Sequence, residues 1–171
     1  MTAKKKRTPQ DLRATAYHEA GHAVANIAQG LTIDTVSIIP GKGYHGMCIS
    51  PSVWEYDAAS TRERRAIGRM IIIGCYAGMH AQRIVEPGAK FGAEGDEHQA
   101  FQASRKWCVL PRYSSVGDDA HLKYLGRLKR ESRRLVNRHR DAIAALAKEL
   151  LRKQELDEAA AKAIVEPLLN N

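Results

Sequence analysis

The segment from residue 60 to residue 86 constrains the fold of this chain more than any other. Its centre is apolar on almost every side of a helix, through Ile67, Met70, Ile71, Ile72, Ile73, Cys75 and Ala77. A helix without a polar face has to be covered by other elements. Ser60 or Thr61 offers a start, and the Pro-Gly pair after residue 86 offers a stop. We therefore predict that residues 60–86 form the buried helix of the domain.

The N-terminal part of the chain carries signals for one helix and two strands. Residues 8–30 are predicted to be helical, because Thr8 is a capping residue followed by proline and Gly30 suits a C-terminal stop. Residues 33–39 and 44–50 have the composition of strands, and the turn between them is rich in glycine. The sequence therefore predicts a small β-hairpin directly after the first helix.

The C-terminal half is predicted to be entirely helical. A third helix is expected over residues 96–110, a long amphipathic stretch with leucines at helical spacing after Gly117, and a short last helix after Asp157. No repeats or linkers interrupt these patterns. The prediction is one α+β, predominantly α-helical domain over residues 1–171, with a flexible basic N-terminus at 1–8.

Composition excludes several classes of protein. Hydrophobic residues make up 44% and charged residues 27%, a balance typical of globular rather than disordered chains. No apolar run is long enough to cross a bilayer, and no apolar stretch follows the basic start as in a signal peptide, so a cytoplasmic location is expected. Cys48, Cys75 and Cys108 are an odd number without a C-x-x-C pair, which argues against a disulfide framework or a thiolate zinc site.

The run His18-Glu19-Ala20-Gly21-His22 lies inside the first predicted helix. Histidines four residues apart project from one helix face and can reach a single metal ion. Glu19 is displaced around the helix, so it can take a proton from a water held by the metal instead of binding the metal itself. The H-E-x-x-H pattern therefore predicts a zinc site with Glu19 as the catalytic base.

Two histidines leave zinc with too few protein ligands, because a catalytic site needs a third ligand and an open position. The candidates are Glu55, Glu63, Glu86, Glu94, Asp96, Glu97, His98 and His121. Asp96 stands where a glycine-rich loop becomes a helix, but an aspartate there is equally an ordinary helix cap. His98 follows two residues later, on another side of the helix. Spacing alone leaves the third ligand open and favours the capping role for Asp96.

Residues 15–24 (TAYHEAGHAV) closely resemble the peptidase module of FtsH-type membrane AAA+ proteases. The resemblance covers most of the chain, from about residue 9 to residue 165, and includes residues 36–40, 76–81, 92–96, 150–151 and 155–157. It implies a mostly helical zinc-metallopeptidase domain with a small β-hairpin. It also implies that zinc is held by His18, His22 and Asp96, with Glu19 as the catalytic base.

The chain departs from this family in two ways. The family's ATPase and membrane segments have no counterpart here, and the 171 residues contain no G-x-x-x-x-G-K-[ST] nucleotide loop. The buried helix of the family carries acidic residues where this chain has Met79, His80, Gln82 and Arg83. A carboxylate that would orient a ligand histidine is therefore expected to be missing. Its loss would affect metal affinity and the rate of catalysis.

The basic charge raises nucleic acid as an alternative partner. Residues 123–153 contain eleven Lys and Arg against three acids, in a chain of net charge +8. Aromatic residues are few and form no stacking platform, so a solvated helix face is the preferred interpretation. Nucleic acid is therefore an unlikely partner on the sequence evidence.

Three functions compete for this sequence. The leading prediction is an ATP-independent zinc metalloendopeptidase acting on unfolded or short polypeptides, supplied by a separate ATPase or adaptor. The alternatives are a catalytically weak binding or regulatory module and a nucleic-acid-binding protein with structural zinc. An intact Glu19 argues against both alternatives, because a structural site needs no base. Homo-oligomerisation is left open.

Overall fold

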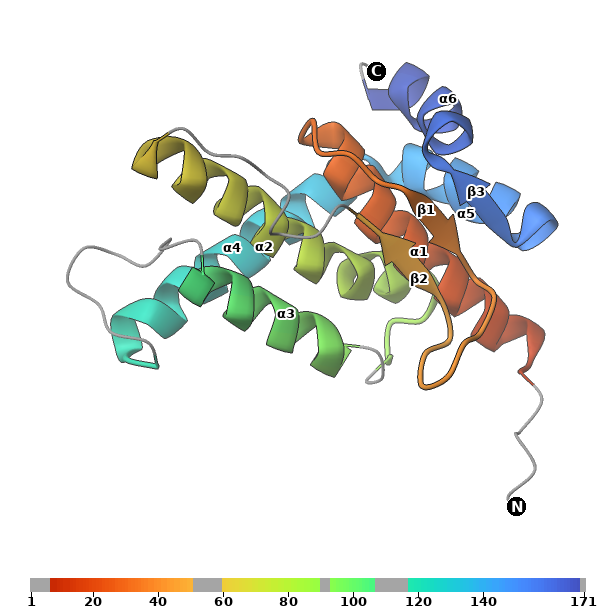
Figure 1. Ribbon diagram of the computed structural model, residues 1–171. Helices are drawn as coiled ribbons and strands as arrows, with labels where there is room; N and C mark the ends of the chain where they lie inside the picture. The colour runs from red at the N-terminus through yellow and green to blue at the C-terminus, as the bar shows by residue number, and fades with distance from the viewer. Residues whose placement is uncertain (1–6, 51–59, 90–92, 107–116, 170–171) are drawn as a thin grey trace.

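The computed structural model describes residues 7–50, 60–89, 93–106 and 117–169. Within these ranges the chain forms a predominantly helical α+β fold with a small antiparallel sheet (Figure 1). In chain order the elements are α1 (Pro9–Ala28), β1 (Thr35–Ser37), β2 (Met47–Ile49), α2 (Thr61–Val85), α3 (Ala93–Lys106), α4 (Asp119–Arg138), α5 (Arg140–Lys153), β3 (Glu155–Asp157) and α6 (Glu158–Leu169). The predictions that concern Glu55 and Cys108 lie outside the described residues.

The predicted ends of α1 are confirmed. Thr8 and Asp11 form a reciprocal capping box at its start, with proline at the first helical position. At its end, Gly30 has φ +74° and its N–H donates to the carbonyl of Ile27, while the following N–H reaches back to Asn26. This pairing closes the last turn, so the helix holds residues 18 to 22 in a regular interior.

The predicted buried helix is also confirmed. Ser60 caps the start of α2 through its hydroxyl, and Glu86 is the residue at its C-terminal end. Side chains on several sides of its second half are buried, namely Ile72, Ile73, Tyr76, Ala77, Met79 and Ala81. The helix packs against α1 on one side and against α3 and α4 on others, as Figure 1 shows.

The contact between α1 and α2 depends on small residues. A Cβ atom at Gly21 would lie 2.5 Å from the Cβ of Ala81 and 2.8 Å from the carbonyl oxygen of Ala77. Both distances are shorter than van der Waals contact, so only glycine permits this approach. The close crossing brings the face of α1 that carries His18 and His22 directly over α2.

The sheet contains one strand more than the sequence predicted. The hairpin is confirmed, although its strands are only three residues long, and β1 pairs with β2 through Val36 opposite Cys48. On its other side β1 pairs with β3, where Val36 faces Leu156, so the strand order is β2-β1-β3. Residues 155–157 were predicted to precede a helix but not to form a strand, because three residues are too few to show alternation.

Two helix boundaries differ from the prediction. Helix α3 begins at Ala93, so Asp96 lies within its first turn and does not cap it. The long amphipathic stretch is divided at His139, the last residue before α5 begins. The hydrophobic spacing continues across this break, because both α4 and α5 bury leucines, and the pattern therefore could not reveal it.

The buried side chains form two clusters. One centres on α1, β1, α5 and α6 and includes Ala77 and Ala81 of α2, and the other joins α2, α3 and α4. Leu135 packs against both. Near the N-terminus, Arg7 donates hydrogen bonds to the carbonyls of Ile38 and His45, so the side chain ties the hairpin loop to the start of α1. No helix among the described residues has both the length and the apolar character that crossing a membrane requires.

Candidate metal centre

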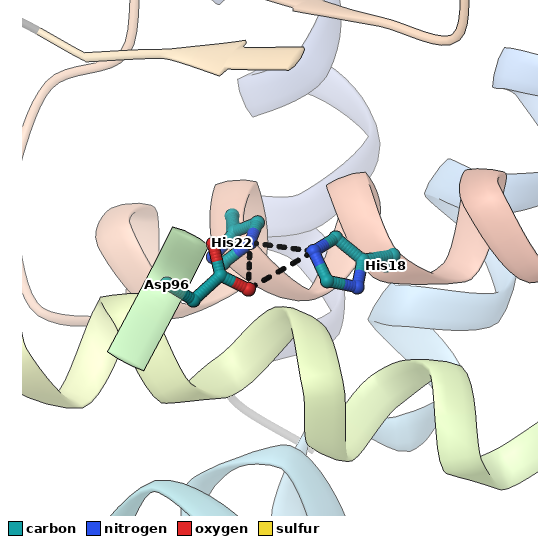
Figure 2. Close-up of side chains that lie close together, drawn as sticks. All are labelled: His18, His22 and Asp96. Atoms are coloured by element: carbon teal, nitrogen blue, oxygen red, sulfur yellow. Dashed lines mark hydrogen bonds and ion pairs between the residues drawn. The ribbon is translucent and has the colours of Figure 1, made fainter. Parts of the chain in front are cut away.

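Helix α1 presents His18 and His22 on the face that looks toward α3. Their Nε2 atoms are 3.1 Å apart, as expected for side chains one helical turn apart. Figure 2 shows both rings with the Asp96 carboxylate between α1 and α3, above α2. The Asp96 Oδ2 atom lies 3.1 Å from Nε2 of His18 and 3.4 Å from Nε2 of His22. Three donor atoms from two helices thus surround a single point.

Asp96 reaches this point from the first turn of α3. Although spacing alone favoured a capping role, its side chain is turned toward the two histidines, as the resemblance implied. Its Oδ2 atom is buried and makes no hydrogen bond within the described residues. A buried carboxylate oxygen without a hydrogen-bond donor is costly, so Oδ2 needs a positive partner, which either a bound cation or a protonated imidazole would supply.

The remaining ring nitrogens fix how the two imidazoles are protonated. His22 Nδ1 lies 2.9 Å from the carbonyl oxygen of Gly74, and His18 Nδ1 lies 3.1 Å from Oε1 of Gln82. Both partners are acceptors, so each Nδ1 carries the hydrogen and each Nε2 of a neutral ring keeps its lone pair. Two nitrogen lone pairs and a carboxylate oxygen therefore point toward one another.

Gly78 of α2 lies directly against these donor atoms. A Cβ atom there would lie 2.3 Å from Nε2 of His22 and 2.8 Å from Nε2 of His18. Even a methyl group would therefore displace the rings. The missing side chain leaves room where the three donor atoms converge. The sequence resemblance included Gly78, but the reason for glycine at this position emerges only from the packing of α2 against α1.

The donor set fits zinc. Tetrahedral zinc bound to nitrogen at about 2.0–2.1 Å separates its ligand atoms by roughly 3.3 Å, close to the separations of His18, His22 and Asp96. Two imidazoles and one carboxylate also form the kind of ligand set found in catalytic zinc sites. Among the described residues these three are the group whose donor atoms could together hold an ion.

The ionisable side chains around this point shift one another's pKa values. Although burial opposes a charged imidazole, the Asp96 carboxylate raises the pKa of His22 to about 9. Burial likewise opposes a charged carboxylate, but His22 and His18 hold the pKa of Asp96 well below its usual range. Without a metal the site therefore retains a proton beside the carboxylate. Metal binding has to release that proton, so metal affinity should fall in acid.

Glu19 lies beside the cluster but outside it. Its side chain is only 7% exposed, and burial raises the pKa of its carboxyl group, while the neighbouring His22 and His18 oppose the rise. The nearby backbone N–H of Cys48 in β2 acts in the same direction and also lowers this pKa. A Cβ at Gly46 would lie 2.8 Å from Oε1 of Glu19, so glycine lets the hairpin cover this side chain closely. Neither backbone contact was predicted from the sequence.

The other candidate ligands lie elsewhere. His98 is exposed and accepts a hydrogen bond from Gln102, and Glu97 forms an ion pair with Lys129 of α4. His121 is fully buried, where it accepts from the N–H of Gly117 and donates to the hydroxyl of Ser104. Its two ring nitrogens are thus both satisfied. None of Glu63, Glu86, Glu94, Glu97, His98 and His121 joins the cluster.

The basic segment forms an exposed face of α4. Lys123, Arg127, Arg130, Arg134 and Arg138 recur at helical spacing and fall within roughly 80° of the helix circumference. All five are exposed, and the buried residues of α4 occupy the opposite side of the helix. This distribution is what a solvated helix face requires.

Comparison with known proteins adds a distant relationship. The chain is 27% identical over 179 residues to a protein from Thermus thermophilus named ATP-dependent zinc metalloprotease FtsH, an alignment covering 93% of this chain and 27% of that protein. It is similarly 27% identical over 183 residues to ATP-dependent zinc metalloprotease FtsH 2 from Methylacidiphilum infernorum, covering 86% of this chain and 28% of the relative. The chain is distantly similar to FtsH zinc metalloproteases. It spans between a quarter and a third of the length of these relatives, and no family model matches it.

Proposed function

We propose that this chain is a zinc-dependent endopeptidase that hydrolyses peptide bonds in unfolded or short polypeptides. The observation that carries the proposal is the convergence of donor atoms from His18, His22 and Asp96, with the Glu19 carboxylate beside them. The distant relatives, which are named zinc metalloproteases, support the same chemistry.

His18, His22 and Asp96 would hold the metal, since their donor atoms already lie within 3.4 Å of one another. Zinc, when bound, supplies a Lewis acid that polarises a peptide carbonyl and lowers the pKa of water. Glu19 takes the proton of the attacking water and later gives it to the leaving amine. Because burial raises the pKa of Glu19, its basicity is closer to that needed for proton transfer near neutral pH.

Strand β2 offers a surface for an extended substrate. Among the described residues it is an edge strand of the sheet, paired with β1, and its Cys48 N–H lies near Glu19. An extended polypeptide can pair with an exposed strand edge through its backbone, which brings a peptide bond toward the strand's neighbours without demanding a particular sequence. Unfolded and short polypeptides present such extended segments freely, so they are the proposed substrates.

Delivery of substrate by an ATPase or adaptor is part of the same proposal. Both relatives are named ATP-dependent, whereas the 171 residues here contain no nucleotide-binding loop of the P-loop type. By itself this domain has no means of unfolding a protein with ATP. We expect it to cleave flexible polypeptides without ATP and folded ones only with a partner.

A catalytically weak binding or regulatory module is the second candidate. The observation that favours it is the neutral amide of Gln82 against His18, where a carboxylate would bind the imidazole more strongly. Such a module would bind zinc and polypeptide but turn over slowly.

The decisive experiment compares zinc content and casein cleavage in three proteins. The wild type should carry about one zinc per chain and cleave casein in a chelator-sensitive reaction. Glu19→Gln should keep its zinc and lose about two to four orders of magnitude in rate, because only the base is removed. His18→Ala should lose both. Zinc content near zero in wild-type protein supplied with zinc would defeat the proposal, and zinc without cleavage would favour the binding module.

A further inference from the structure

We propose that Gln82 and Glu86 are positioning residues that together fix the orientation and the tautomer of His18 for metal binding. This inference rests on the proposed function, because it assigns the support of one of the proposed ligands. Neither residue touches the point where the donor atoms converge, so both act through His18.

The two residues form a chain of hydrogen bonds that ends at the metal centre. The Nε2 of Gln82 donates to Oε2 of Glu86 over 3.2 Å, and Oε1 of Gln82 lies 3.1 Å from Nδ1 of His18. Gln82 and Glu86 are one turn apart at the end of α2, where the backbone N–H of Glu86 also bonds to the carbonyl of Gln82. Both side chains therefore leave the same side of α2, one turn apart.

The donor and acceptor in each of these two hydrogen bonds follow from the chemistry of Glu86. A carboxylate only accepts hydrogen bonds, so the NH₂ group of Gln82 has to face Glu86. The amide oxygen of Gln82 then has to face His18, and it too only accepts. His18 must therefore carry its hydrogen on Nδ1, which leaves the Nε2 lone pair for a metal. The carboxylate thus sets the state of a ring that it does not touch.

The two histidines are supported in different ways. Nδ1 of His22 bonds to the backbone carbonyl of Gly74, which no side-chain substitution removes. Nδ1 of His18 depends on two replaceable side chains. Glu86 is half-buried and borders a surface groove lined by Pro9, Gln10, Arg13, Ala14 and Val85. Substitution at this end should therefore perturb the support of His18 and leave the core intact.

The neutral amide should also limit how tightly the metal is held. A hydrogen bond to a charged acceptor is roughly twice as strong as one between neutral groups, and it makes the imidazole a better ligand. Here the negative charge of the pair lies on Glu86, one helical turn beyond Gln82, and not on the group that bonds to His18. Exchanging the two side chains would bring the carboxylate against His18 without changing composition, size or net charge.

The experiment measures zinc affinity by competition with a coloured chelator in four proteins. Gln82→Met keeps the size of the side chain but removes the amide, and should weaken zinc binding about 10- to 100-fold. The double variant Gln82→Glu/Glu86→Gln should bind zinc more tightly than the wild type, by about 10-fold. Arg83→Met is the matched control, since Arg83 is exposed on the same turn, and should be unchanged. Equal affinities for wild type and Gln82→Met would overturn the proposal while leaving the peptidase function standing.

A second measurement tests the positioning without metal. Nitrogen chemical shifts of His18 in zinc-free protein at alkaline pH, where imidazoles are neutral, report which ring nitrogen carries the hydrogen. The wild type should show the hydrogen on Nδ1, and Gln82→Met should show a mixture of both forms. The same form in both proteins would overturn the proposal. A wild type that binds no zinc would count against the proposed function, and the chemical shifts would still decide the role of Gln82.

Discussion

Gly78→Ala should abolish zinc binding while leaving the metal-free fold nearly as stable as before. The added Cβ would lie 2.3 Å from Nε2 of His22 and 2.8 Å from Nε2 of His18. Van der Waals contact requires roughly 3.5 Å, so the rings have to move by about 1 Å. Metal–ligand distances tolerate changes of only about 0.2 Å, so a displacement of this size is incompatible with shared coordination.

The effect of Gly78→Ala on stability is expected to be small because two terms oppose each other. Alanine is favoured over glycine in a helix interior by about 1 kcal/mol. Moving the ends of two histidine side chains costs a similar amount, since such side chains can rotate away. The free energy of unfolding of metal-free protein should therefore change by less than about 1 kcal/mol. In a domain of this size that corresponds to a shift in melting temperature of about 2–4 °C.

The assay is thermal unfolding with chelator and with zinc. Zinc at about 100 times its dissociation constant should stabilise the wild type by about 2.7 kcal/mol, which is roughly 5–10 °C. Gly78→Ala should show no such rise. Gly126→Ala is the control: its Cβ would meet only the end of Arg130 in α4, at 3.7 Å, so the rise with zinc should persist. A rise for Gly78→Ala equal to that of the wild type would refute the assignment of this point as the metal site.

Three further predictions concern other parts of the molecule. Gly21→Ala should lower the free energy of unfolding by about 1–3 kcal/mol in urea titrations with chelator, because the backbone oxygen of Ala77 cannot move away; unchanged stability would contradict the packing argument. Asp96→Ala should lose zinc in elemental analysis while His98→Ala keeps it, and the reverse result would reassign the third ligand. Burial lowers the pKa of His80 to about 4. Because the folded protein favours the neutral ring, the contribution of His80 to the free energy of unfolding is fully present above the unfolded-state pKa of about 6.5. This contribution is lost as pH falls toward 4, and the loss should be about 1–2 kcal/mol after allowance for solvent screening. The acid loss should shrink in His80→Gln, and an unchanged pH dependence would exclude His80 as its source.

The parts of the fold that the sequence predicted are those encoded by neighbouring residues. The ends of α1 and α2 follow from caps within four residues of the boundary, as at Ser60. The placement of His18 and His22 on one face follows from helix geometry alone. The same local reasoning favoured Asp96 as a helix cap, which was wrong. A local signal cannot show that the helix begins three residues earlier, at Ala93.

The parts that the sequence did not reveal depend on how the helices lie against one another. Gln82 and His18 are 64 residues apart, and their contact exists only because α2 crosses α1 closely. The sequence indicated that a carboxylate was absent at Gln82, but not that the amide oxygen would face His18. The role of Gly78 likewise has no local signature, because helical glycines that contact nothing have the same sequence appearance. The exclusion of side-chain volume is a property of the packed pair of helices.

The pairing of β1 with β3 has a consequence for the order in which the site is completed during synthesis. Among the described residues, strand β2, whose Cys48 N–H lies near Glu19, is joined to the sheet through β1, and β1 is paired on its other side by residues 155–157. Two strands of three residues form a marginal hairpin by themselves. The cover over Glu19 should therefore remain loose until residues 155–157 have left the ribosome, long after both histidines have emerged. A growing chain would thus expose the helix that carries His18, Glu19 and His22 early and gain the β2 cover over Glu19 only late.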